Sequence, residues 1–212
     1  MTAARGAGRP LLALAGAMVL VVLAALAFTL LTARPGNGAT PGAESPDAGF
    51  SRDMAVHHQQ AVEMSLIVRD RTDDEDVRRL AYDVINTQAN QRGMLLGWLD
   101  LWGLPKSSSE PPMTWMGHGA AYPPHDGALM PGMATNTELR RLDAAHGKAA
   151  AVLYLQLLTA HHKGGVEMAA AAADLARTDQ VRRLAAGMVQ GQEAEIRLMA
   201  DMLAARGASP AP

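Results

Sequence analysis

The sequence predicts an all-α protein, a four-helix bundle built from two repeated helical hairpins and preceded by an N-terminal transmembrane helix. Only 4% of the 212 residues are aromatic. Ala and Leu are the commonest residues, and together with Met, Arg, Gln and Glu they favour helices because they lose little side-chain entropy there. An uncharged apolar stretch near the N-terminus is long enough to cross a bilayer. The remaining chain matches itself without a gap when it is shifted by 104 positions, the difference between 57 and 161.

The apolar stretch, residues 11–33, has arginines on both sides and no charge within it. A hydrocarbon core of roughly 30 Å needs about 20 helical residues, whereas a cleavable signal usually has only about 7–15 apolar residues. We therefore expect a single-pass anchor in the plasma membrane, with residues 1–10 in the cytoplasm and the C-terminal domain extracytoplasmic. The alternative is a signal peptide cleaved at Ala25-Leu26-Ala27, which would make the protein secreted.

The rest of the chain divides into a linker, one domain and a tail. Residues 34–45 are rich in Gly and Pro and predict a flexible linker. Residues 46–207 predict the bundle domain, because one hairpin alone is too small to bury its apolar face. Within this domain, residues 104–134 form a long loop rich in Met, His, Pro and Gly, and loops of this length are usually functional or disordered. Residues 208–212 are expected to form a disordered tail.

Local signals predict where the helices begin and end. The expected helices cover residues 46–71, 73–102, 136–176 and 178–206. The expected helix starts are Ser45 before Pro46, capping boxes at Thr72 with Glu75 and at Thr135 with Glu138, and a cap at Thr178. Gly103 and Gly207 should end the two hairpins, and Gly147 should break the third helix near its start.

One face of each repeated helix carries histidine and methionine. Positions three and four residues apart share a face of a helix, and in the first copy they hold Met54, His57, Ala61, Met64 and Val68. The second copy repeats this face with Leu158, His161, Gly165, Met168 and Ala172. His58 and His162 lie about 100° further round the helix. The partner helices place Gln88 and Gln192 among apolar residues, with Gln91 and Glu195 beside them.

This pattern predicts a site for a soft transition metal. A buried imidazole costs free energy unless it is hydrogen-bonded or bound to a metal, and two symmetric pairs on faces that also carry Met favour a metal. The chain has no cysteine, so neither a thiolate site nor an iron–sulfur cluster can form. Imidazole and thioether ligands suit copper, and Met favours Cu(I). A copper ion is therefore the expected cofactor.

The candidate ligands come from both repeats and from the loop between them. The acidic residue that precedes the methionine of each repeat is included, as are the methionines of the MPGM segment. The set is His57, His58, Met64, His161, His162, Met168, Met54, Glu63, Glu167, Met130 and Met133. The loop holds further soft ligands at Met113, Met116, His118 and His125.

Several functions are disfavoured by the sequence. The net charge of -2 offers no basic surface for nucleic acid. A di-iron bundle centre needs Glu-x-x-His pairs, and none is present. The HExxH, Walker A and GxSxG motifs are also missing. We therefore expect a protein that is not an enzyme.

The two segments DMAVHHQQAVEM at 53–64 and LTAHHKGGVEMA at 158–169 resemble the paired signatures of domain-of-unknown-function family 305. The resemblance covers roughly residues 50–206, and MPGM at 130–133 and Gln192 with Glu195 also match. It implies a ferritin-like bundle that is usually exported, with some members copper-binding and linked to copper tolerance. Two departures are Gln91, which stands where the pattern has Glu, and Leu157-Leu158 before the second His pair.

By motif, six of the candidate ligands carry over from the resemblance. They are His57, His58, Met64, His161, His162 and Met168.

Two other functions stay open at this point. In the first, the bundle is a structural or partner-binding protein without metal, and its histidines are hydrogen-bonded to Gln88, Gln192 or Glu195. In the second, His and Met are axial ligands of a b-type haem inside the bundle.

Overall fold

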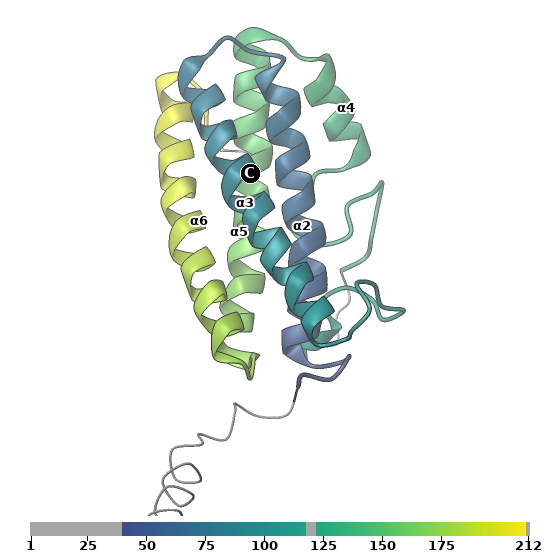
Figure 1. Ribbon diagram of the computed structural model, residues 1–212. Helices are drawn as coiled ribbons and strands as arrows, with labels where there is room; N and C mark the ends of the chain where they lie inside the picture. Colours follow the sequence, from purple (N-terminus) through teal and green to yellow (C-terminus); the bar gives the residue numbers. More distant parts are fainter. Residues whose placement is uncertain (1–39, 118–121, 211–212) are drawn as a thin grey trace, which may run out of the picture. The chain divides into compact units, whose positions relative to one another are not determined.

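The computed structural model describes residues 40–117 and 122–210 (Figure 1). The expected anchor at 11–33 and most of the expected linker lie outside these residues. Within the described ranges, no helix combines the length and the apolar character needed to cross a membrane.

The described residues form an all-helical bundle, which confirms the predicted fold class of this domain. The elements are α2 (Pro46–Arg69), α3 (Glu75–Leu101), the 3₁₀ helix η1 (Thr114–Met116), α4 (Asn136–Ala144), α5 (Gly147–Leu175) and α6 (Asp179–Ala205). The four long helices α2, α3, α5 and α6 make the bundle, and the short α4 lies outside it (Figure 1). The β-type pairing in these residues is limited to an isolated bridge between His125 and Ala128.

Two of the four predicted helix caps make the expected hydrogen bonds. Ser45 accepts a hydrogen bond from the backbone of Ala48, and Thr135 with Glu138 forms the complete capping box of α4. The predicted box at Thr72 is wrong: the carboxylate of Asp74 caps α3 by accepting from Val77 N. Asp74 wins because it directly precedes the helix, whereas the Thr72 hydroxyl accepts a hydrogen bond from Asp74 N.

The caps of α5 and α6 also depart from a simple pattern. Thr178 occupies the N-cap position of α6, but its hydroxyl donates to Asp47 at 2.7 Å and makes no capping bond. The predicted single helix over 136–176 is two helices. The break falls at Gly147 as expected, where φ is +56° and the amide donates to Arg71 O at 2.7 Å.

The two hairpins, α2–α3 and α5–α6, pack together through α2 and α5. One apolar cluster joins the C-terminal half of α2 to the N-terminal half of α5, and includes Met64 and Leu158. A second cluster joins the other two halves, and includes Met54 and Met168. The helices α2 and α5 therefore run antiparallel. The His-His pair of each helix lies along the chain between the residues that enter the two clusters.

Candidate metal centre

Four imidazoles meet in the middle of the bundle. His57 and His58 come from α2, His161 and His162 come from α5, and all four side chains are fully buried. The rings of His57 and His161 lie with centroids 3.7 Å apart and planes inclined at 31°. The rings of His161 and His162 are 6.2 Å apart. The structure thus brings together the four histidines predicted from the repeat.

The Nε2 atom of each imidazole faces an oxygen atom. His57 Nε2 is 3.4 Å from Pro131 O, and His161 Nε2 is 2.9 Å from His57 O. Since a carbonyl oxygen can only accept a hydrogen bond, these Nε2 atoms carry the proton. His58 Nε2 lies 2.8 Å from Gln91 Oε1, and His162 Nε2 lies 2.6 Å from Glu195 Oε2. Both oxygens accept in the same way.

The Nδ1 atoms of all four histidines are buried without a hydrogen-bond partner among the described residues. A neutral imidazole has one N–H, so protonation at Nε2 leaves a lone pair on Nδ1. Buried polar atoms are normally satisfied, and four unsatisfied ones of the same kind need an explanation. A histidine ligand of a metal commonly donates its other N–H to a carbonyl or carboxylate. The Nε2 contacts of the four imidazoles are of this kind, and the Nδ1 lone pairs are the ones that could bind a metal.

The buried environment keeps three of the imidazoles, those of His57, His58 and His161, neutral. Desolvation lowers the pKa of His57 to about 4 and that of His58 to about 3. Desolvation, together with the other three histidines, lowers the pKa of His161 well below its ordinary value. Because only neutral imidazole can donate a lone pair, these three side chains can bind a metal at neutral pH.

Buried methionines lie on both sides of the imidazoles. Met54, Met130 and Met168 share one apolar cluster, and Met64 belongs to the other. Met133 packs, partly buried, against the first of these clusters. The methionine thioethers are therefore distributed unequally between the two ends of the bundle.

The MPGM segment is held firmly against the helices. The amide of Gln60 bonds both backbone groups of Ala134, at 2.8 and 2.7 Å. A Cβ atom on Gly164 would lie 2.0 Å from Pro131 O, and one on Gly132 would lie 2.3 Å from Ala160 O. The sequence analysis did not predict these three contacts. Gln60 and Gly164 occupy equivalent positions of the repeat, and both contact the segment that contains MPGM.

Two predicted ligands lie on another face. Glu63 and Glu167 are exposed, and helical periodicity places each about 140° round from the second histidine of its pair. Residues 40–117 and 122–210 contain no group of three or more His, Asp or Glu side chains that could hold a metal ion. A metal in this region would therefore need methionine sulfur, or a rotation of the imidazoles, to complete its coordination.

In the part of the loop that the structure describes, the further candidate ligands are not brought to the four histidines. His125 is exposed and Met116 is buried, and His118 lies outside the described residues. The metal-free interpretation expected hydrogen bonds from the histidines to Gln88 or Gln192, and the buried amides of these residues make none. Gln192 Oε1 instead lies against Gly165. The predicted contact with Glu195 is present.

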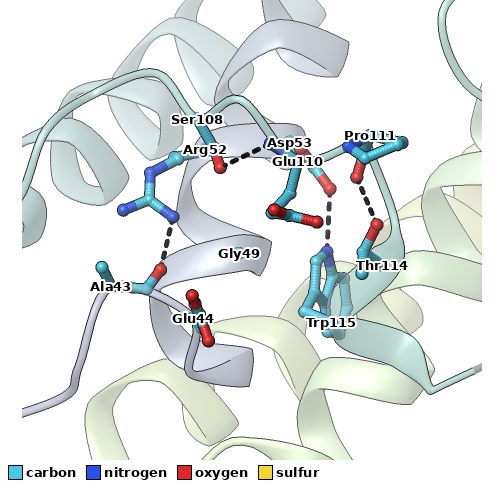
Figure 2. A pocket seen from close by; sticks show the side chains of 10 residues that line it. All are labelled: Ala43, Glu44, Gly49, Arg52, Asp53, Ser108, Glu110, Pro111, Thr114 and Trp115. Carbon is cyan, nitrogen blue, oxygen red and sulfur yellow. Dashed lines mark hydrogen bonds between the residues drawn. The ribbon is translucent and has the colours of Figure 1, made fainter.

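A separate hollow of about 330 Å³ opens at the start of α2. Figure 2 shows Trp115 donating to Asp53 and Arg52 donating to Ala43 across this hollow. Burial raises the pKa of Asp53. None of the candidate ligands lines the hollow, whose contacts fasten the loop after α3 to α2.

The helical bundle and its two histidine pairs are shared with a known protein family. The chain belongs to the family Domain of unknown function (DUF305), which matches residues 47–203. This match confirms the resemblance inferred from the paired segments. No curated protein matches the chain.

Solved structures of the family share the fold. A Streptomyces coelicolor structure, named "putative secreted protein DUF305", is 62% identical, with a TM-score of 0.75, and the match covers 81% of this chain and 99% of that chain. A DUF305 fragment from Deinococcus radiodurans is 28% identical, with a TM-score of 0.59 and coverage of 73% and 92%.

CopM in its Cu(I)-bound form is 19% identical, with a TM-score of 0.56 and coverage of 72% and 91%. Its Cu(II)-bound form is 19% identical, with a TM-score of 0.55 and coverage of 73% and 93%. At this identity the likeness shows a shared fold.

Proposed function

We propose that this protein binds and buffers copper outside the cytoplasm, through the four-histidine centre. The observation that carries the proposal is that all four Nδ1 atoms are buried without a partner, while each Nε2 faces an oxygen. Imidazoles in this state fit a metal that accepts nitrogen lone pairs.

The surrounding side chains favour copper among the possible metals. Fully buried Met54, Met64 and Met168 offer soft thioether sulfur, which suits Cu(I), and imidazole suits either oxidation state. Bound copper would supply an acceptor for these lone pairs. The protein's own residues would hold the ion, exclude water and orient the rings through their Nε2 bonds. The Cu(I)-bound and Cu(II)-bound forms of CopM, which has the same fold, support this choice.

The proposed location combines two observations. The similar Streptomyces coelicolor protein is named as secreted, and residues 11–33 have the length and apolar character of an export segment or anchor. We place the domain on the outer side of the plasma membrane, tethered by that segment. In this role the protein holds metal and catalyses no reaction.

A metal-free structural bundle is the second candidate. It is favoured by the bond from His161 Nε2 to His57 O, which joins α5 to α2, and by the contact of His57 with the MPGM segment. These bonds would stabilise the bundle whether or not a metal binds.

Thermal unfolding separates the two candidates. Copper that binds only the folded chain raises its melting temperature by mass action. We expect Cu(I) and Cu(II) to raise the melting temperature of the wild type near neutral pH. The gain should vanish when His57, His58, His161 and His162 are all replaced by Gln, which keeps a polar side chain but is a poor soft-metal ligand. A wild type that gains no stability from either ion would contradict the proposal and favour the structural bundle.

A further inference from the structure

The two histidine pairs have different partners at equivalent positions. His58 Nε2 donates to an amide oxygen of Gln91, and His162 Nε2 donates to a carboxylate oxygen of Glu195. In each case the partner follows its histidine by 33 residues, and both imidazoles are fully buried. The repeat thus provides two copies of one contact that differ by a single formal charge.

That difference changes what each imidazole can donate. An N–H that donates to a carboxylate leaves more electron density on the other ring nitrogen, and such partners raise the basicity of histidine ligands. The contact at His162 is made to a carboxylate, and hydrogen bonds to an ionised acceptor are about twice as strong as those between neutral groups. The negative charge of Glu195 also adds an attraction to a bound cation, and this attraction grows with the charge of the ion.

We propose that Glu195 makes the histidine centre unequal, so that His162 is a stronger ligand for Cu(II) than His58. This inference rests on the proposed copper function. Glu195 acts here as a positioning residue, because it would act on the metal through His162, which it contacts. The extra charge matters less for Cu(I), which carries one charge instead of two.

Two isosteric exchanges test the proposal on the full chain. Glu195→Gln keeps the hydrogen bond and removes the charge, and we expect it to weaken Cu(II) binding at the centre by about 10- to 100-fold, the usual effect of removing such a partner. The loss for Cu(I) should be smaller. Gln91→Glu adds a charge beside His58 and should strengthen Cu(II) binding. Both affinities can be measured by competition with a chromophoric chelator for Cu(II) and for Cu(I), and circular dichroism checks that each variant is folded.

The outcomes separate this proposal from the function on which it rests. A wild type that binds neither ion would overturn the copper function and this proposal with it. A wild type that binds Cu(II) with the same affinity as Glu195→Gln would overturn the proposal alone, as would equal losses for Cu(I) and Cu(II). If Glu195→Gln does not fold, an unchanged Cu(II) affinity in Gln91→Glu would also overturn it.

Discussion

His57 and His161 lie face to face where α2 meets α5, with ring centroids 3.7 Å apart, and the Nε2 atom of His161 donates to the backbone oxygen of His57. Neither ring has solvent around it. A proton on either ring would place a cation against its neighbour in a dry interior, where charge is costly. The stability of the metal-free protein should therefore depend on keeping both rings neutral.

The first prediction is a loss of stability in mild acid. Unfolded histidines titrate near the ordinary value of 6.5, whereas burial lowers the pKa of His57 to about 4. Between these values the unfolded chain binds protons that the native protein does not. The stability that depends on neutral histidines is therefore complete above pH 6.5 and falls as the pH drops towards 4, by about 1.4 kcal/mol per pH unit for each such group. Denaturant unfolding of the metal-free chain from pH 7 to 4 measures this slope.

The matched control for acid stability replaces both His57 and His58 by Gln, which does not titrate. The variant should have a flatter pH profile than the wild type over the same range. If the two profiles are parallel, the acid sensitivity does not come from His57 and His58.

A second prediction concerns the close contact between the MPGM segment and Gly164 of α5. Gly164→Ala should destabilise the protein, because its Cβ would lie 2.0 Å from Pro131 O, a backbone atom that can move only with the segment. Gly191→Ala is the control: it lies in α6 with no atom within 4 Å of an added Cβ, so it should stabilise the protein by about 0.5–1 kcal/mol. Melting temperatures of the two variants should move in opposite directions. A shift in the same direction would show that the segment does not rest on Gly164.

Overpacking tests the buried face of α2. Ala61 is fully buried beside Met64 in one apolar cluster, so Ala61→Leu should cost about 1–3 kcal/mol. Ala170→Leu makes the same change at an exposed position of α5 and should be nearly neutral. Equal melting temperatures for Ala61→Leu and the wild type would place this face outside the core.

A fourth prediction concerns attachment to the membrane. If residues 11–33 stay on the mature protein, the chain should fractionate with membranes, and protease added outside the cell should remove the domain beyond Arg34. Recovery of the whole domain in the soluble exported fraction, with an N-terminus near Phe28, would support the cleaved signal instead.

Helical periodicity and the internal repeat predicted the bundle, because both can be read from the order of the residues without knowledge of tertiary contacts. The same patterns brought His57 and His161 onto facing surfaces of α2 and α5, as the structure places them. The helix start at Asp74 was missed because two competing caps, Thr72 and Asp74, lie within three residues and only geometry decides between them.

The remaining features depend on contacts between distant parts of the chain. Periodicity cannot show that Gln60 fixes Ala134 across the fold, or that Gly164 leaves room for the MPGM segment. The exposed position of Glu63 could have been found, because it lies well round the helix from His58. The sequence shows that the two copies of the repeat differ at Gln91 and Glu195. Only the structure shows that these residues bond to His58 and His162.

The most direct test of the central claim is the copper content of the purified, untagged full chain after loading and exhaustive dialysis at neutral pH. The wild type should retain copper, whereas the variant with Gln at positions 57, 58, 161 and 162 should lose it while keeping its helical circular dichroism. Each buried Nδ1 without a hydrogen-bond partner provides the lone pair that the variant removes. A wild type that retains no copper, or a variant that retains as much as the wild type, would contradict the account.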